Sequence, residues 1–141
     1  MNKIELLAPA GSPESFKLAV KAGADAIYLG LAEGFNARMK ADNFNIENIE
    51  EYIKYAHIFN VKVYVTVNTL VNDDEFDNCL NLIFECFNKG VDAFIIQDLG
   101  LVSFLRKNYP NIPIHISTQA GVNNTESAYF YSKLGVKRIV L

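Results

Sequence analysis

Two segments of the chain alternate apolar and polar side chains in a way that restricts the kind of sheet they can join. Residues 61–68 read VKVYVTVN and residues 112–119 read IPIHISTQ. Successive side chains of a strand point to opposite faces, so each segment has one aliphatic face and one polar face. A central strand of a doubly wound sheet is usually apolar on both faces. The pattern instead indicates a parallel barrel, whose strands face outer helices on one side and a packed interior, polar near the catalytic mouth, on the other.

The alternation also predicts where individual side chains point. The aliphatic set should pack against helices: Val63, Val65, Val67, Ile114 and Ile116. The polar set should face the interior of a curved sheet: Tyr64, Thr66, Asn68, His115, Ser117 and Gln119. A shift of one residue in either strand would reverse every assignment, so the prediction is easily tested against coordinates.

A helix end, a glycine and a strand recur at residues 21–29, 89–96 and 134–141. Glycine adopts the left-handed conformation that ends a helix, and Asn60 is expected to do the same before the strand that begins at residue 61. Strands are predicted near 4–9, 26–30, 61–68, 93–97, 112–118 and 137–141. Helices are predicted near 13–22, 46–59, 74–88, 99–108 and 125–134.

Strands that alternate with helices through short connections predict an α/β fold with a parallel (β/α) TIM-barrel-like sheet. A closed barrel of this kind has eight strands and about 250 residues. Residues 1–141 are therefore predicted to be the N-terminal part of a single TIM-barrel-like domain, incomplete with about six of eight strands. The remainder of the barrel and any C-terminal region would be absent. The first and last strands would then have open edges, which favour self-association.

Composition excludes several classes of protein. Half of the 141 residues are hydrophobic, enough for a globular core, yet no apolar run reaches the length of a membrane span and no signal peptide precedes the first strand. We therefore expect a cytoplasmic protein without a membrane partner. The net charge of −3 gives no general attraction to nucleic acid. Cys79 and Cys86 share one face of a predicted helix and are interpreted as buried hydrophobic residues, with no metal site in the chain.

Polar residues in the first long loop and at the strand ends are the candidates for substrate binding. The loop at residues 30–45 exceeds the usual two to six residues of such connections, and an arginine within it can pair with a carboxylate or phosphate. Amides and hydroxyls at the strand ends can orient a substrate but cannot act as bases. The candidates are Asn36, Arg38, Asn68, Gln97, Ser117, Gln119 and Asn123.

Two further residues near strand ends are better explained as helix caps. Ser12, followed by Pro13, has the pattern of a helix start, although the amides there could instead receive an anion. Asp98 precedes the helix expected at residue 99. His115 is interpreted as a buried, hydrogen-bonded core histidine and His57 as a surface residue. No nucleophile and base are placed together by the sequence, so the catalytic residues remain unassigned.

Five ordered blocks of sequence carry a resemblance to a known family. They are residues 5–12 (ELLAPAGS), 23–30 (GADAIYLG), 61–70 (VKVYVTVNTL), 95–100 (IIQDLG) and 114–119 (IHISTQ). From Ile4 to Leu141 the chain resembles the collagenase-like peptidase family U32. The resemblance implies a TIM-like barrel at the N-terminus of a longer protein. It also implies an iron–sulfur cluster in full-length relatives, held by cysteines beyond this region, with none in this chain.

The resemblance leaves three functions open. Relatives implicated in hydroxylation of a tRNA wobble uridine or an rRNA cytidine suggest that the full-length protein acts on RNA nucleobases. The family name suggests instead a true peptidase, a collagenase-like hydrolase. A non-catalytic binding or assembly module is the third alternative. Because the sequence shows no peptidase machinery and no cluster ligands, the chain alone is expected to be inactive.

Overall fold

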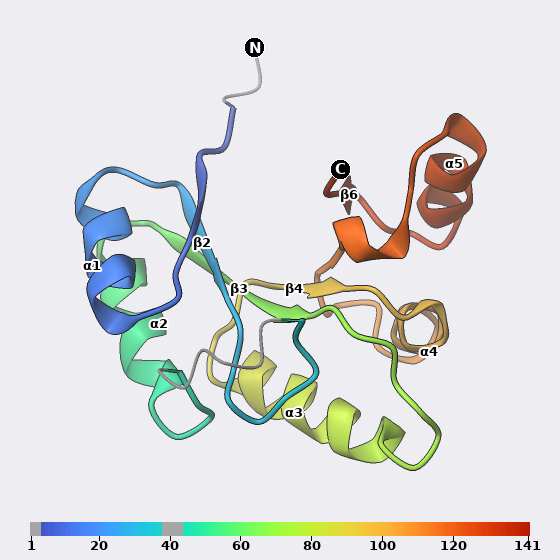
Figure 1. The fold of residues 1–141 in the computed structure, drawn as a ribbon, viewed down its shortest axis with the longest axis horizontal. Helices are drawn as coiled ribbons and strands as arrows, with labels where there is room; N and C mark the ends of the chain where they lie inside the picture. Colours follow the sequence, from blue (N-terminus) through green and yellow to red (C-terminus); the bar gives the residue numbers. More distant parts are fainter. Residues whose placement is uncertain (1–3, 38–43) are drawn as a thin grey trace.

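The computed structural model describes residues 4–37 and 44–141 as parallel strands and helices in alternation (Figure 1). Six strands form one sheet in chain order, and each pairs in parallel with the next. They are β1 (Leu7–Pro9), β2 (Ala26–Leu29), β3 (Lys62–Val67), β4 (Ala93–Ile96), β5 (Ile114–Ile116) and β6 (Arg138–Ile139). All the predicted strands are present, each shorter than expected. The sheet curls into a half-barrel, as the TIM-barrel-like prediction requires.

Helices follow the strands and lie on the outer side of the curl (Figure 1). They are α1 (Pro13–Lys21), α2 (Ile49–Ile58), α3 (Phe76–Asn88), α4 (Leu99–Asn108) and α5 (Thr125–Lys133). A short 3₁₀ helix, η1 (Thr118–Ala120), follows β5 and was not predicted. No described helix is long and apolar enough to cross a bilayer.

Local chemistry explains where the helices begin and end. The Ser12 hydroxyl accepts from the Ser15 amide, and the Ser15 hydroxyl accepts from the Ser12 amide, so the start of α1 has a reciprocal capping arrangement. Asp98 Oδ1 accepts from the Leu101 amide 2.8 Å away and caps α4, as predicted. Gly90, after α3, has φ of 99° and Asn60, after α2, has φ of 56°. Both therefore adopt the left-handed conformation expected where a helix gives way to a strand.

The two faces of the sheet have separate packing partners. Val63, Val65 and Val67 belong to the large hydrophobic core, together with Ile114, Ile116 and the buried faces of the helices. The opposite face holds a smaller cluster that contains Ala26, Tyr64, Ala93 and Ile95. The predicted alternation is therefore confirmed for these strands, and the helices cover only the aliphatic face. The inner face is left to form the interior of the half-barrel.

An ion network lies in the barrel interior near the amino-terminal ends of the strands. This interior ion network consists of Glu5, Tyr64 and Arg138. The Tyr64 hydroxyl donates to Glu5 at 3.0 Å and accepts from Arg138 Nη1 at 3.1 Å, while Arg138 also pairs directly with Glu5. Burial, reinforced by the bond to Glu5, raises the pKa of Tyr64 to about 12. Burial opposes ionisation of Glu5, but Arg138 and Tyr64 outweigh it and lower the pKa of that carboxyl. The network connects β3 and β6 with the residues before β1 across the interior.

His115 lies beside this network, and its environment differs from the prediction. Its ring meets the Tyr64 ring edge-on with centroids 4.7 Å apart, so it faces the interior as expected. We expected the ring to be hydrogen-bonded. This expectation is wrong for Nδ1, which is buried and has no hydrogen-bond partner among the described residues. Burial, and then the charge of Arg138, lower the pKa of His115 to about 4. The ring is therefore neutral near pH 7 and packs mainly as an aromatic group.

Candidate functional site

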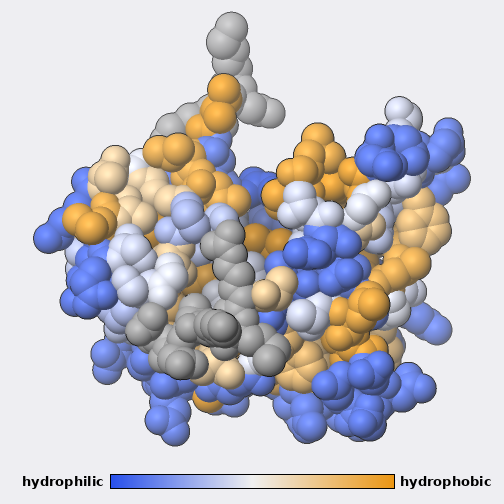
Figure 2. Space-filling view, in the orientation of Figure 1, coloured by the Kyte–Doolittle hydropathy of each residue, from blue (hydrophilic) through white to orange (hydrophobic). Residues whose placement is uncertain are grey.

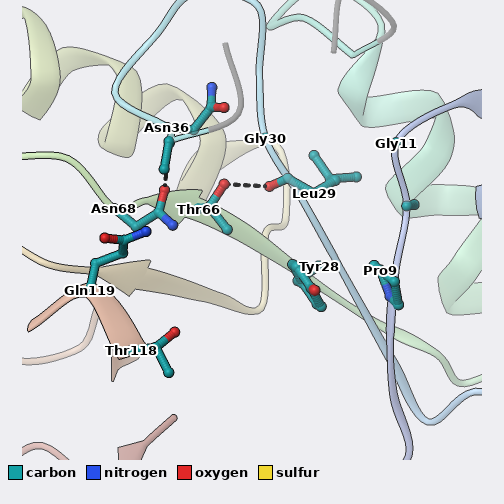
Figure 3. A pocket seen from close by; sticks show the side chains of 12 residues that line it. Pro9, Gly11, Tyr28, Leu29, Gly30, Asn36, Thr66, Asn68, Thr118 and Gln119 are labelled. Carbon is teal, nitrogen blue, oxygen red and sulfur yellow. Dashed lines mark hydrogen bonds between the residues drawn. The ribbon is translucent and has the colours of Figure 1, made fainter. Parts of the chain in front are cut away.

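A cavity of about 400 Å³ opens at the carboxyl ends of the first three strands (Figure 3). Its walls come from the ends of β1, β2 and β3, from the start of the long loop after β2, and from η1. The lining residues are Pro9, Ala10, Gly11, Tyr28, Leu29, Gly30, Asn36, Ala37, Thr66, Asn68, Thr118 and Gln119. Parallel barrels bind their substrates at this end of the strands. The cavity is therefore the candidate site.

One side chain of β3 bonds to the end of β2, and another just after β3 bonds to the first loop. The Thr66 hydroxyl donates to the Leu29 carbonyl oxygen at 3.1 Å. Asn68 Oδ1 accepts from the backbone amide of Ala37 at 3.0 Å. Both bonds are drawn in Figure 3. Asn68 thus holds the loop at Ala37, beside the cavity.

Asn36 lines the cavity but is built into its wall. Its side chain is 2% exposed, and Nδ2 donates to the Leu31 carbonyl oxygen at 2.7 Å. It packs so closely on Gly30 that a Cβ added there would lie 2.8 Å from Asn36 Cγ. Asn36 therefore shapes the loop, and Gly30 provides the space that it needs.

The structure separates the other predicted site residues into three groups. Asn68 and Gln119 both line the cavity, and both are drawn in Figure 3. Ser117 is buried, and its hydroxyl caps η1 by accepting from the Gln119 amide at 3.1 Å. Together with Asn68 it lines a second, smaller hollow. Gln97 follows β4 outside the lining of the cavity, and Asn123 is exposed, accepting from Asn124 Nδ2 at 2.9 Å. Arg38 lies outside the described residues.

Several lining residues were not among the candidates. Tyr28 pairs in register with Tyr64, so its side chain lies on the interior face. Thr66 had been placed on that face without a functional role, and Thr118 follows β5 within η1. The position of Tyr28 in the alternation along its strand could have shown that it faces the interior. However, the rest of β2 is apolar, so the strand shows no clear alternation of polar and apolar residues. Residues at the end of β1 reach the cavity because the sheet curls. The sequence pattern does not specify this curl.

The described lining is polar but carries no charged side chain. Amides, hydroxyls and backbone groups surround the cavity, and the interior ion network lies toward the other end of the strands. At the start of α1, the amides of Gly11 and Ser12 donate to the Ser15 hydroxyl, so the cap explanation of Ser12 is confirmed. Such a site can orient a neutral ligand by hydrogen bonds, but its amides and hydroxyls cannot act as bases near neutral pH.

Neither cysteine fits a metal or cluster ligand. Cys79 and Cys86 are both buried in α3, and burial raises the pKa of each thiol to about 12. Thiolates ligate iron and zinc, so a strongly raised thiol pKa opposes that role. Across residues 4–37 and 44–141, no three histidine, cysteine or carboxylate side chains are grouped to hold a metal ion. His57 is exposed and contacts Asp92 at 2.9 Å, on the outside of the fold.

The fold and the cavity together define a β/α half-barrel with a cavity at the carboxyl ends of its strands, whose described lining is uncharged. This chain belongs to peptidase family U32, whose sequence profile matches residues 11–141. The resemblance predicted from the five sequence blocks is therefore confirmed.

Three relatives carry names from two kinds of chemistry. The chain is 39% identical to the 23S rRNA 5-hydroxycytidine C2501 synthase of Escherichia coli K12 over 99% of its length and 21% of that protein. It is 44% identical to tRNA hydroxylation protein P of Helicobacter pylori 26695, over 99% of the chain and 33% of that protein. A protein named collagenase from Porphyromonas gingivalis W83 is 34% identical over 94% of the chain and 32% of its own length. The chain thus spans a third or less of these relatives.

A solved structure supports the fold. The U32 peptidase Mk0906 superposes with a TM-score of 0.74 and 16% identity, over 97% of this chain and 57% of that one. At this level of identity the likeness concerns the arrangement of strands and helices. It agrees with the half-barrel described above.

Proposed function

We propose that the cavity holds a pyrimidine base of RNA, and that the protein acts in RNA nucleobase hydroxylation. The observation that carries the proposal is the lining of the cavity, which is neutral and supplies amide, hydroxyl and backbone groups without a described ionised side chain. A volume of about 400 Å³ falls within the range of small-ligand sites. The names of the RNA-modifying relatives give the proposal its reaction type.

A pyrimidine ring matches this lining chemically. Its edge presents neutral hydrogen-bond donors and acceptors, which carboxamides such as those of Asn68 and Gln119 can complement. Its faces are flat and can contact the Tyr28 ring and Pro9, as extruded bases commonly contact aromatic side chains. An RNA base must leave its stack to enter such a mouth, and the phosphates then remain outside. This arrangement is consistent with a chain whose net charge is −3.

Peptide hydrolysis receives less support from the same residues. A peptidase needs an activated nucleophile or a metal-bound water near the scissile carbonyl. The described lining contains two threonine hydroxyls but no histidine, cysteine or carboxylate to activate them. His115 is packed against Tyr64 in the interior, and His57 is on the outer surface. A hydrolase would have to obtain its reactive groups from outside the described part of this chain.

The proposal assigns binding to this chain and the oxidation to other parts of the protein. Hydroxylation of a base needs an oxidant and electron transfer, which amides and hydroxyls do not provide. We propose that residues 1–141 are the N-terminal part of a longer barrel domain, and that an iron–sulfur cluster, where present, is held by cysteines beyond it. The proposal places the protein in the cytoplasm, where tRNA and rRNA are modified.

A hybrid protein tests the proposal. In the H. pylori relative, the segment that matches this chain is replaced by residues 1–141, and the product is expressed in cells that lack tRNA hydroxylation. Mass spectrometry of tRNA nucleosides should detect the added oxygen. Gln119→Ala should reduce the product, whereas Asn123→Ala, at an exposed position outside the cavity, should not. Equal products from the two variants, or no product from a folded hybrid protein, would contradict the proposed function.

A further inference from the structure

We infer that a second hollow, at the amino-terminal end of the strands, binds a phosphate group between Arg106 and Lys137. The hollow has a volume of about 270 Å³ and lies between the connection from α4 to β5 and the connection from α5 to β6. The candidate cavity at the carboxyl ends of the strands shares no lining residue with it. The inference therefore does not depend on the proposed function.

Arg106 is fixed between the end of α4 and the start of β5. Its Nη2 donates to the Tyr109 carbonyl oxygen at 3.2 Å and also to the carbonyl oxygen of Ile112. These two acceptors hold the plane of the guanidinium in place. Nε is buried and has no acceptor among the described residues. Nη1 is consequently the branch left to meet a ligand in the hollow, which Arg106 lines.

The charge of Arg106 is not neutralised by an acid. Among residues 4–37 and 44–141, no carboxylate forms an ion pair with its guanidinium. Burial lowers the pKa of Arg106, and no neighbouring carboxylate offsets that shift. A half-buried cation without a counter-charge is costly. A negatively charged group in the hollow supplies that counter-charge.

Lys137 brings a second cation to the hollow from a different part of the chain. It lies between α5 and β6, is exposed, and has no ion pair with a carboxylate of the described residues. Asn111, in the connection before β5, adds a carboxamide that can donate to the same ligand. The described lining thus contains two cations and no acid, the reverse of what a metal cation requires.

Two buried nitrogens give independent support. Arg106 Nε and His115 Nδ1 are the buried side-chain polar atoms without a hydrogen-bond partner in the described part of the chain, and both residues line this hollow. Buried polar atoms are nearly always paired, and exceptions often mark the place of an ion. An anion beside them reduces the cost, because Arg106 is cationic and a neutral histidine can carry its hydrogen on Nδ1.

Phosphate matches these donors better than a carboxylate does. Arg106 comes from α4 and Lys137 from the connection after α5, so the donors reach the hollow from two separate elements. A tetrahedral phosphate presents oxygens in several directions, whereas a carboxylate presents two in one plane. Arginine and lysine are also common phosphate ligands. Hydrophilic side chains gather over α5 at the upper right of Figure 2, so the element before Lys137 offers a polar surface to a charged ligand.

Titration with inorganic phosphate tests the site. The 141-residue protein, labelled with ¹⁵N, is titrated near neutral pH at constant ionic strength, with sodium chloride as the balancing salt, and its backbone amide shifts are followed by NMR. The amides of Gly135 and Lys137 should shift and saturate. We expect a Kd of about 1 mM, the affinity that two charge-assisted hydrogen bonds imply.

Lys137→Gln removes one cation at an exposed position and should weaken phosphate binding about tenfold. Lys107→Gln is the matched control, because it removes the same charge from an exposed position next to Arg106 but outside the lining. The Kd of that control should not change. Arg106→Gln should abolish saturation. If Arg106→Gln does not fold by circular dichroism, Lys137→Glu replaces it and should abolish binding by reversing the charge.

A short RNA distinguishes two sources of the phosphate group. An adenosine pentamer that shifts the same amides and competes with phosphate identifies the RNA backbone as the source, whereas a pentamer that does not compete leaves a small phosphate ester. Saturable binding that Lys137→Gln weakens supports the site in either case. Shifts that do not saturate, or that the two lysine variants weaken equally, overturn it. Because the hollow is separate from the cavity, that result leaves the proposed function standing.

Discussion

The two ends of the half-barrel interior contain different chemistry. The interior ion network lies near the amino-terminal ends of the strands, where Glu5, Tyr64 and Arg138 are joined by hydrogen bonds and an ion pair. The carboxyl end opens into a cavity whose described lining is uncharged and includes Thr66 and Asn68. The same face of β3 and its continuation contributes to the ion network and to the cavity. Along this segment Tyr64, Thr66 and Asn68 alternate with the valines that pack on the helices.

The difference indicates how the two ends contribute. Half-buried charges are tolerated where each has a partner, and such a network holds separate strands together. A ligand site has a different need, since its side chains must keep a donor or an acceptor available for the substrate. We therefore expect substitutions in the ion network to affect mainly stability and substitutions at the mouth to affect mainly binding. The following predictions test that division, from the largest expected effect to the smallest.

Replacing Tyr64 should cause the largest loss of stability. Its side chain is 2% exposed and contacts Glu5, Arg138 and His115, so Tyr64→Ala leaves a cavity and an ion pair without its bridging hydroxyl. We expect the free energy of unfolding in urea to fall by about 3–5 kcal/mol. Gln119→Ala, at an exposed position of η1, should change it by less than about 0.5 kcal/mol. Similar costs for the two variants would contradict the division between the ends.

Gly30→Ala should affect both stability and binding. The added Cβ would lie 2.8 Å from Asn36 Cγ and Oδ1, and Asn36 is held by its bond to the Leu31 carbonyl oxygen. We expect a loss of about 1–3 kcal/mol, typical of overpacking, together with weaker RNA binding. Gly11→Ala is the matched control for stability alone, since nothing lies within 4 Å of a Cβ at that position but Gly11 also lines the cavity. Unchanged binding by Gly30→Ala would show that Asn36 does not shape the mouth.

Self-association through the sheet edges should be weak and dependent on concentration. The last strand, β6, contains only Arg138 and Ile139, so a second copy would find a short ladder to extend. Light scattering of the purified chain should show an average mass that rises with concentration. Ile139→Lys should reduce the rise, because charged residues at an edge discourage pairing. A monomer at every concentration would contradict the prediction.

His115 should make the fold sensitive to moderate acid. Burial and Arg138 lower its pKa to about 4 from about 6.5, so the unfolded chain binds the proton more readily than the folded one. Its contribution to stability is complete above pH 6.5 and is lost as the pH falls from 6.5 toward 4. Urea midpoints of His115→Leu should decline less over that window than those of the unsubstituted protein. The lowered pKa of Glu5 adds a separate loss below pH 4.5, which both proteins should share.

Arg38→Ala should have the smallest effect. The long loop after β2 makes its arginine the expected charged anchor for a substrate, although the residue lies outside the described part of the chain. In the hybrid protein the substitution should lower hydroxylation by about threefold, within the range of about 0.2–1 kcal/mol for single exposed ion pairs. The melting temperature should not change, because loop positions contribute little to the core. Full activity of the variant would exclude Arg38 as an anchor.

Sequence reasoning located the elements because their signals are local. The alternation of apolar and polar residues in 61–68 and 112–119 indicates which face of each strand packs on the helices. Asn60 and Gly90, which adopt the left-handed conformation, indicate where two helices end. The caps at Ser12 and Asp98 were predictable for the same reason, since each depends on residues within one helical turn. The family followed from the same blocks of sequence. These properties are determined by the sequence itself.

Only the tertiary structure decided which residues meet. Glu5 and Arg138 are separated by 133 positions and become partners because the sheet curls. The curl also brings the end of β1 to the same cavity as η1, and it leaves Asn123 and Gln97 outside the lining. The bond from the Ala37 amide to Asn68 depends on the path of a long loop. Alternation specifies a face of the sheet, whereas curvature and loop path determine distances across it, and no short-range pattern encodes them.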